Sequence, residues 1–405
     1  MAPQRLSTLS TALVLVLGAV SPSAWADAWQ INPTLTLRQS YDDNFRLTER
    51  KDKVWGTNLI ASVKLSRLTE DLDVNGLVRL DFVKYSGDTD NISDKNNQLF
   101  SFNIDKKYAL DRLQLRTLLR RDTLLRSVQL YFDPGEVEIE PGIGVNSAVV
   151  PRNVRRSRTI IRPSWDHQIT ERLNGGLEYR YEGVTYDNIG QGEQLLDYRT
   201  HTVYARSQYA LSERHQLVGS LATSKFDPDQ TPTSYNVALR LGIHGQLSET
   251  QNYGLEIGPR YSRVGRDGQS DDTDLGASAL AFVELKHEVT RYRAQYEHRL
   301  RPSSNGKVLE TDELILNAYH SLSPRIRLSM RTRMYATGAL GTSSGGTVKN
   351  YIQAAPTLTY VIDPDWRVQL SYRFTTIERS NQSREYSNAG FISLNYSAKS
   401  FLDWF

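Results

Sequence analysis

Residues 291–301 read R-Y-R-A-Q-Y-E-H-R-L-R and alternate between two kinds of side chain. The odd positions are charged or polar: Arg291, Arg293, Gln295, Glu297, Arg299 and Arg301. The even positions are mostly aromatic or aliphatic: Tyr292, Ala294, Tyr296, His298 and Leu300. Alternation with a period of two predicts a β-strand whose two faces meet different surroundings.

The same alternation recurs in other long segments. Residues 366–375 place apolar side chains on one face, namely Trp366, Val368, Leu370, Tyr372 and Phe374. Residues 177–182 and 325–331 follow the same pattern, and residues 58–65 follow it with the exception of Ile60. Repeated alternation over long segments favours a sheet over helices.

Short turn-like clusters separate these segments at intervals of about forty residues. They centre on residues 70, 111, 171, 213, 249, 290, 324 and 364, so the gaps are 41, 60, 42, 36, 41, 34 and 40 residues. Longer polar stretches lie between them, such as S-G-D-T-D-N-I-S-D-K at residues 86–95. A tight turn, a strand, a long loop and a strand, repeated in this way, predict an up-and-down meander.

Eight tight turns and nine longer connections predict about 18 antiparallel strands. An even strand count, with short turns on one side and long loops on the other, is typical of outer-membrane barrels. We therefore predict an all-β transmembrane β-barrel over residues 27–405, in preference to a soluble sandwich or propeller. Aromatic girdles are expected from Trp165, Trp366 and Trp404 near the tight turns. Near the long loops they are expected from Tyr41, Tyr85, Tyr186 and Tyr261.

Residues 1–26 are typical of a secretory signal peptide. They combine Arg5, a short apolar core at residues 12–20 and the small-residue pattern A-W-A at residues 24–26. The predicted location is the cell outer membrane, with membrane lipid and the outer-membrane assembly machinery as partners. The chain has no cysteine, which excludes disulfides and thiolate metal sites. Its formal charge of +3 says nothing about nucleic acid, and we predict no nucleic-acid partner.

The arginines are expected to point into the lumen. A charged side chain facing lipid costs about 2–4 kcal/mol near the membrane midplane, and a barrel of this size encloses water. The predicted lumen-lining arginines are Arg112, Arg116, Arg120, Arg156, Arg158, Arg162, Arg291, Arg293, Arg299, Arg301, Arg325, Arg327, Arg331, Arg333, Arg367 and Arg373. Such a wall would attract anions or an acidic polymer. The alternative is that these arginines pair with luminal carboxylates and brace the wall.

The gap of 60 residues contains one outsized loop, residues 129–151. This loop is acidic, with Asp133, Glu136, Glu138 and Glu140, and it has no basic residue. We predict that it folds into the lumen as a constriction, and an ordinary exposed loop is the alternative.

No motif for catalysis or metal binding is present. The seven histidines lack zinc-ligand spacing, and neither G-x-S-x-G nor H-E-x-x-H occurs. We therefore predict no enzyme, cofactor or metal. A barrel enzyme acting on lipid or glycan remains an alternative, because residues on neighbouring strands leave no linear motif.

The end of the first predicted strand carries the sequence Y-D-D-N-F-R-L, which comprises Tyr41, Asp42, Asp43, Asn44, Phe45, Arg46 and Leu47. This stretch resembles the outer-membrane family called β-barrel porin 2, which includes proteins of exopolysaccharide biosynthesis operons. The chain departs from the family pattern in continuing through residues 397–405 after its glycine-aromatic stretch at residues 390–396.

The resemblance implies a conduit or accessory for exopolysaccharide export, with periplasmic export components as partners. An anion-preferring diffusion porin for small solutes is the alternative. Asp42, Asp43 and Asn44 are expected to cap the first loop, and a bound cation is the other possibility.

Overall fold

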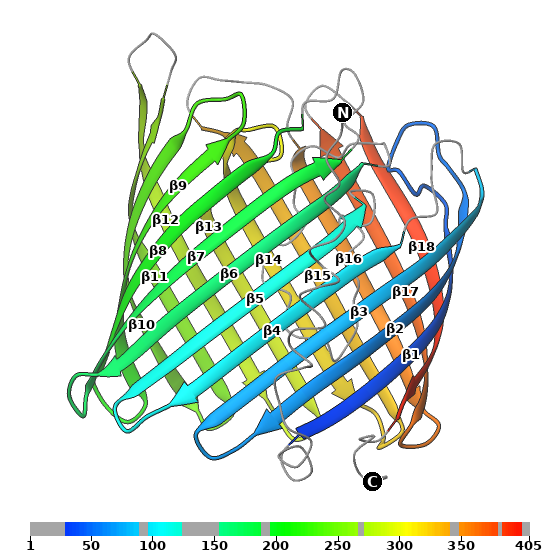
Figure 1. Ribbon diagram of the computed structural model, residues 1–405, viewed down its shortest axis with the longest axis horizontal. Coiled ribbons are helices and arrows are strands. Elements are labelled where there is room, and N and C mark those ends of the chain that lie inside the picture. Colours follow the sequence, from blue (N-terminus) through cyan, green and yellow to red (C-terminus); the bar gives the residue numbers. More distant parts are fainter. Residues whose placement is uncertain are drawn as a thin grey trace, which may run out of the picture.

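The computed structural model describes residues 29–88, 96–123, 154–187, 195–265, 271–340, 348–379 and 383–398. These residues form eighteen strands that run up and down in chain order (Figure 1). The strands are β1 (Trp29–Asp42), β2 (Val54–Leu68), β3 (Leu72–Gly87), β4 (Asn97–Lys107), β5 (Asp111–Thr123), β6 (Arg155–Gln168), β7 (Leu173–Asp187), β8 (Tyr198–Ala210), β9 (His215–Pro228), β10 (Ser234–Ser248), β11 (Gln251–Val264), β12 (Asp272–Lys286), β13 (Thr290–Pro302), β14 (Val308–Ser321), β15 (Ile326–Ala339), β16 (Val348–Val361), β17 (Trp366–Arg379) and β18 (Arg384–Ser397).

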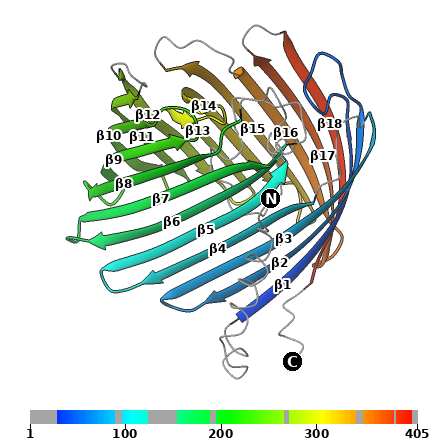
Figure 2. The ribbon, with the colours of Figure 1, turned by 45° about the horizontal axis from the view of Figure 1, so that its top comes forward.

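Each strand pairs antiparallel with its neighbours in sequence, and β1 also pairs with β18. That last pairing runs from Thr34 opposite Ser397 to Asp42 opposite Ala389, and it closes the sheet into a ring (Figure 2). Closure leaves no sheet edge between the first and last strands, which is what a β-structure surrounded by lipid requires. The predicted all-β, 18-stranded antiparallel barrel is confirmed. The described residues contain no helix long and apolar enough to cross a membrane.

The predicted tight turns lie at one end of the barrel, and their first residues explain why the chain reverses there. Asp363 Oδ1 accepts the backbone N–H groups of Asp365 at 2.9 Å and Trp366 at 2.8 Å. Thr170, Ser212 and Ser323 accept the corresponding N–H groups of their own turns through their hydroxyl oxygens. A short polar side chain at the first position thus satisfies donors that the strand ladder leaves free.

The two faces of the wall have opposite chemistry. Leucine and isoleucine side chains cover the outside, with Leu241 62% and Ile257 61% exposed. Polar side chains cover the inside, such as Gln353 at 1% and Thr357 at 3% exposure. Ile60 breaks the alternation and lies on the inner face, where it is buried. An apolar outside around a polar inside is the arrangement of a transmembrane barrel.

The predicted aromatic girdles are only partly right. Trp165 and Trp366 lie on the outer face near the tight turns, and Tyr41 and Tyr261 lie on the outer face near the loops. Tyr85 and Tyr186 instead point inward, which corrects the prediction. Tyr85 packs edge-to-face on Phe45 at 5.1 Å, and Tyr186 is buried in an inner apolar cluster. Their positions in the alternation put them on the same face as the polar residues of β3 and β7.

Three predictions concern residues outside the described ranges. They are the signal peptide, the loop at residues 129–151 with Asp133, Glu136, Glu138 and Glu140, and the tail after residue 398 with Trp404. These remain predictions.

The assignment of the two faces can be tested in the middle of β9. We expect Leu221→Arg to lower the free energy of unfolding by about 2–4 kcal/mol, because Leu221 faces lipid. Ser220→Arg is the matched control, since Ser220 is on the inner face and its hydroxyl lies 3.4 Å from the carboxylate of Glu256. Urea unfolding in lipid vesicles measures both. An equal loss in the two variants would contradict the assignment.

Candidate functional site

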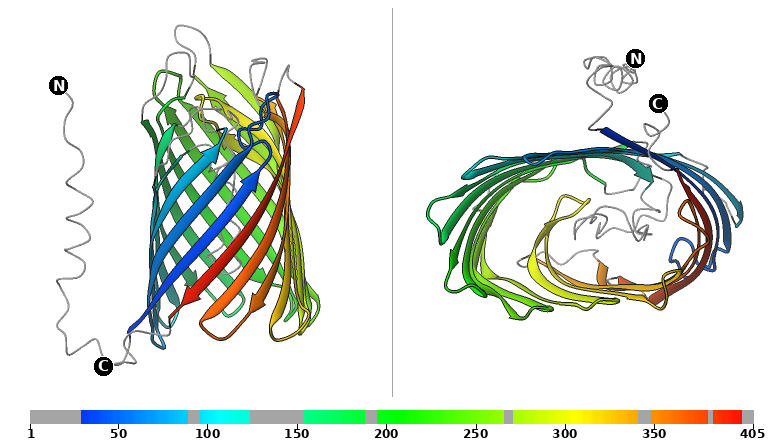
Figure 3. Two further views of the ribbon diagram at one scale, coloured as in Figure 1. Left: turned by 90° about the vertical axis from the view of Figure 1, so that its right-hand side faces the viewer. Right: turned by 90° about the horizontal axis from the view of Figure 1, so that it is seen from below.

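The barrel wall is divided on one side, between β12 and β13. The two strands pair from Lys286 opposite Arg291 up to Ala279 opposite His298, and there the pairing stops. Both strands continue beyond that point, β12 to Asp272 and β13 to Pro302. The loop ends of β13 and β14 leave the wall and lie inside the ring of strands, as the right-hand view of Figure 3 shows in yellow. We call residues 299–310 the inturned hairpin.

The inturned hairpin packs its outer face against the inner face of the opposite wall. Leu300 and Val308 lie on the face that meets lipid lower in the same strands, where Tyr292 and Leu316 are exposed. Here they join a buried cluster whose members include Tyr198 and Phe226 from β8 and β9. The outer face of the hairpin therefore packs against aromatic rings of the inner wall, whereas the same face lower in these strands meets lipid.

Two backbone contacts hold the tip of the hairpin. The backbone N–H of Leu196 donates to the carbonyl of Ser304 at 2.8 Å, and the Thr231 hydroxyl donates to the carbonyl of Gly306 at 3.3 Å. Gly306 has φ 76°, a conformation that favours glycine. Burial raises the pKa of Asp197 at this rim, although its carboxylate accepts the backbone N–H of Tyr186 at 2.8 Å.

Arg260 connects the hairpin to the wall at the divided seam. Its guanidinium lies 3.0 Å from Glu310 of β14 and 3.1 Å from Asp274 of β12, and its side chain is only 3% exposed. Gly276 makes this possible, because a Cβ at residue 276 would collide with the Arg260 guanidinium.

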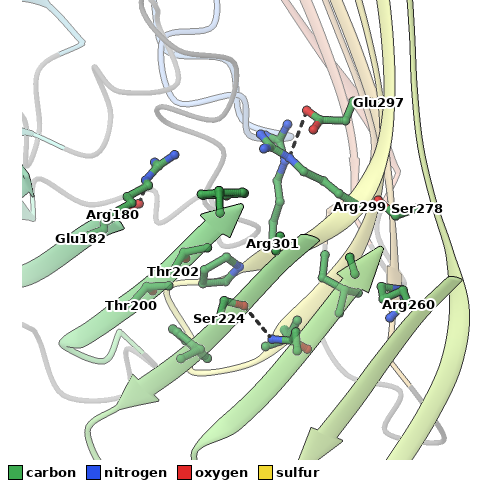
Figure 4. A pocket seen from close by; sticks show the side chains of 18 of the residues that line it. Arg180, Glu182, Thr200, Thr202, Ser224, Arg260, Ser278, Glu297, Arg299 and Arg301 are labelled. Atoms are coloured by element: carbon green, nitrogen blue, oxygen red, sulfur yellow. Dashed lines mark hydrogen bonds and ion pairs between the residues drawn. The ribbon is translucent and has the colours of Figure 1, made fainter. Parts of the chain in front are cut away.

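A cavity of about 210 Å³ lies between the inturned hairpin and the inner wall (Figure 4). Among the described residues that line it, positive charges outnumber negative ones by seven to two. The positive residues are Arg156, Arg158, Arg180, Arg240, Arg260, Arg299 and Arg301. The negative residues are Glu182 and Glu297. Its walls also include the apolar side chains of Tyr198, Phe226 and Leu300.

The lining carboxylates are shared between arginines. Glu182 lies 2.7 Å from Arg158 and 3.0 Å from Arg180. Glu297 lies 3.2 Å from Arg299 and 3.8 Å from Arg240. Each carboxylate thus contacts two guanidinium groups, so the cavity keeps a surplus of N–H donors.

Some of these donors are buried without a partner. Arg301 forms an ion pair with Glu313 on β14, and its side chain is 9% exposed. Its Nε and Nη1 have no hydrogen-bond partner among the described residues, and the same is true of Arg158 Nε. Buried donors in proteins nearly always bond to protein or to ordered water, so these donors are available to an acceptor that enters the cavity.

The structure describes all sixteen of the arginines predicted to line the lumen. Fifteen lie on strands, on the face opposite to the exposed apolar residues, and Arg325 lies in the turn before β15. At least ten form an ion pair with a carboxylate: Arg112, Arg120, Arg156, Arg158, Arg162, Arg291, Arg299, Arg301, Arg333 and Arg373. Their part in a solute path stays a prediction, and the pairing fits the bracing alternative for these ten.

Besides Arg325 in its turn, three of the predicted lumen-lining arginines on strands make no ion pair with any residue that the structure describes, namely Arg116, Arg327 and Arg367. They belong to β5, β15 and β17. Arg293 and Arg331 have other interactions; the Arg293 guanidinium lies 5.7 Å from the centre of the Phe282 ring. The inner face therefore combines braced and unbraced positive charge.

The sequence did not single out two of the carboxylates that organise these arginines, Glu313 and Asp122. Glu313 is 1% exposed and binds both Arg301 and Arg333. Asp122 is fully buried and binds Arg120 at 2.8 Å and Arg156 at 3.0 Å. Their alternation pattern could have placed both on the inner face, but their partners depend on strand register. The described residues hold no group of three or more histidines and carboxylates arranged for a metal ion.

The Y-D-D-N-F-R-L stretch anchors the first loop to the last two strands. Asp42 accepts hydrogen bonds from Arg373 and from Ser387, both at 2.7 Å. Asn44 is fully buried, and its amide donates to the carbonyls of Thr48 and Tyr386 at 3.0 Å. These contacts agree with the expected capping role of this stretch.

The second half of the stretch packs against the inner wall. Phe45 lies against Val54 and Tyr85, and Arg46 forms an ion pair with Asp52. Leu47 adopts φ 52° and joins a buried cluster with Tyr335, Tyr351 and Ile377 from β15, β16 and β17. The stretch thus fastens the first loop along the inside of the barrel.

Comparison with known proteins finds resemblance in outline only. No family model and no curated protein matches the chain, so membership of the β-barrel porin 2 family stays a prediction. A BenF-like porin from Pseudomonas fluorescens Pf-5 aligns at 11% identity and a TM-score of 0.48, over 92% of this chain and 99% of that one. Acinetobacter baumannii OccAB3 aligns at 13% identity and a TM-score of 0.48, over 93% and 100%. Pseudomonas aeruginosa OccK2 (OpdF) aligns at 10% identity and a TM-score of 0.47, over 92% and 98%.

The anchor should contribute strongly to stability. We expect Asp42→Ala to lower the free energy of unfolding by about 3–5 kcal/mol, because it leaves the guanidinium of Arg373 buried without its carboxylate. The control is Asp271→Ala, which removes an exposed pair with Arg263 and should cost at most about 1 kcal/mol. Urea titration in lipid vesicles compares the two. Equal losses would show that the Asp42 contacts are not an anchor.

Proposed function

We propose that the protein is an outer-membrane diffusion channel that prefers small anionic solutes. The observation that carries the proposal is the cavity beside the inturned hairpin, with seven arginines, two glutamates and buried guanidinium donors of Arg158 and Arg301 that have no hydrogen-bond partner among the described residues. An anionic solute would supply acceptors for these donors.

The energetics favour an anion over a neutral solute. A buried donor without a partner costs about 1–3 kcal/mol, and a carboxylate or phosphate oxygen would recover that cost. The guanidinium of Arg301 uses Nη2 for Glu313 and has donors at Nε and Nη1, on different edges of its plane, each of which can donate one hydrogen bond to an oxyanion. Fixed positive charge in a narrow, partly apolar space also raises the local anion concentration.

The size of the cavity favours small solutes. At about 210 Å³ it is smaller than the roughly 300–1,000 Å³ of most ligand pockets. It fits one small carboxylate more readily than a polysaccharide segment. The unpaired arginines at residues 116, 327 and 367 would attract anions elsewhere along the inner face.

The export hypothesis rests on the resemblance of residues 41–47 and on the arginine-rich inner face, and residues 41–47 make contacts that brace the barrel. Export of an acidic polysaccharide therefore remains the second candidate, with no contact in its favour. Addition of an acidic polysaccharide on the tight-turn side of a bilayer tests it. Concentration-dependent block from that side would support export, and no block would favour the small-solute channel. We propose no catalytic activity for the barrel.

Charge selectivity tests the main proposal. In a planar bilayer with a salt gradient, we expect the native protein to give a reversal potential whose sign shows that anions permeate more readily than cations. The double variant Arg158→Gln with Arg301→Gln should lower the anion-to-cation permeability ratio. A charge about 4 Å from an ion in a water-like medium contributes about 1 kcal/mol, which is about fivefold, so removing two such charges should lower the ratio about thirtyfold.

Arg263→Gln is the matched control, because its side chain is 59% exposed and lies on the outer face of β11. It removes a positive charge without touching the cavity and should leave the ratio unchanged. A cation-selective native channel, or an equal change in the control and the double variant, would overturn the proposal.

A further inference from the structure

Among the described residues, the divided seam leaves two strand edges that pair with no other strand, although the Ala277 carbonyl on the β12 edge accepts a hydrogen bond from Arg260 Nε at 3.3 Å. Residues 272–278 of β12 pair with β11, and residues 299–302 of β13 pair with β14, but the two segments do not pair with each other. Free backbone donors and acceptors at the edge of a sheet are ready to pair with another strand. Next to lipid they are costly. Pairing of these two edges would therefore lower the free energy of the barrel.

The register for closing the seam is already set. If the ladder that ends at Ala279 and His298 continued, Ser278 would lie opposite Arg299 and Ala277 opposite Leu300. No insertion or register shift is needed. The β12 segment offers Gly276, Ala277 and Ser278, which are small enough to accept a returning strand.

The apolar face of the hairpin is suited to both positions. Leu300 and Val308 now pack against Tyr198 and Phe226 of the inner wall. In the wall they would face lipid, as Tyr292 and Leu316 do lower in the same strands. Leu300 and Val308 are therefore covered in either position, so the hydrophobic effect on these two side chains does not strongly favour one over the other. Glu310 lies opposite Leu300 on the same face and would have to leave Arg260 and turn outward in the wall position.

Besides the apolar packing of Leu300 and Val308, the described polar contacts that hold the hairpin inside are few. They are the ion pair of Arg260 with Glu310 and the hydrogen bonds at Ser304 and Gly306 described above. On its other side, β14 keeps its ladder to β15 as far as Leu309 opposite Ala339. The loop ends of β13, β14 and β15 would therefore move together as one curled edge of sheet.

We propose that this edge is a gate, which exchanges between the inturned position and a position in the wall paired with residues 272–278 of β12. The hinge is the last paired step, Ala279 with His298. In the inturned position the hairpin supplies Leu300, Arg301 and Val308 to the cavity. In the wall position those side chains leave, so the cavity disappears and the lumen widens. The proposal does not depend on which solutes pass.

The absence of native cysteine allows each position to be trapped by a disulfide. Leu196→Cys with Ser304→Cys traps the inturned position, because a backbone hydrogen bond joins these residues. Ala277→Cys with Leu300→Cys traps the wall position. Ser278→Cys with Arg299→Cys does the same without altering the apolar face. Leu285→Cys with Tyr292→Cys is the control, since these residues are opposite each other in the intact part of the seam.

Cross-linking after mild oxidation in lipid vesicles is measured by mass spectrometry of the linked peptides. We expect the control and the inturned pair to link quickly, and both wall pairs to link more slowly but completely. In planar bilayers, reducing the inturned pair should raise the conductance, and reducing a wall pair should lower it. Reducing the control pair should change nothing.

Three results would overturn the gate. The first is the absence of a cross-link in both wall pairs while the control pair links fully. This result would overturn the gate even if the protein conducts no current in the bilayer. The second is failure of the inturned pair to link while a wall pair links. The third is an unchanged conductance after reduction of both kinds of pair. Anion selectivity measured in the same bilayers is a separate readout, so the gate and the proposed function can fail independently.

Discussion

Lipid outside and water inside is the constraint on which the rest of this structure depends. Because side chains alternate across a strand, that constraint divides each strand into an apolar and a polar face. It also fixes register, since a slip of one residue would expose every charge on one strand to lipid. Arginines are abundant on the inner face for the same reason that leucines cover the outer one. The chemistry of the lumen and the shape of the wall thus share one origin.

The positive charges on the inner face repel one another, and carboxylates that each contact two arginines reduce this repulsion. Glu313 lies between Arg301 and Arg333, Asp122 between Arg120 and Arg156, and Glu182 between Arg158 and Arg180. One carboxylate for two guanidinium groups braces neighbouring strands and still leaves net positive charge. Bracing and anion attraction are therefore compatible uses of one set of arginines.

Alternation and turn chemistry were sufficient to predict the eighteen strands, the closed meander and the two faces. Alternation and turn chemistry could not predict the inturned hairpin, because R-Y-R-A-Q-Y-E-H-R-L-R alternates in the same way on both sides of His298. Nothing in that stretch marks the point where pairing with β12 ends. The cavity was equally hidden, since it joins side chains from Arg156 to Val308, and their meeting depends on how the ring folds inward. Tyr85 and Tyr186 differ from the hairpin and the cavity, because their positions could be predicted: the alternation of β3 and β7 places both side chains on the inner face.

The anchor at Asp42 also bears on the order in which the molecule can assemble. Its hydrogen bond with Ser387 joins residues 345 positions apart, and its bond with Arg373 joins residues 331 apart. Contacts of such sequence separation form late, because the cost in chain entropy rises with the length of the loop they close. A ribosome must also have made nearly the whole chain before either partner exists. The first loop can therefore settle only on a barrel whose final strands are in place, so its docking marks the completion of folding.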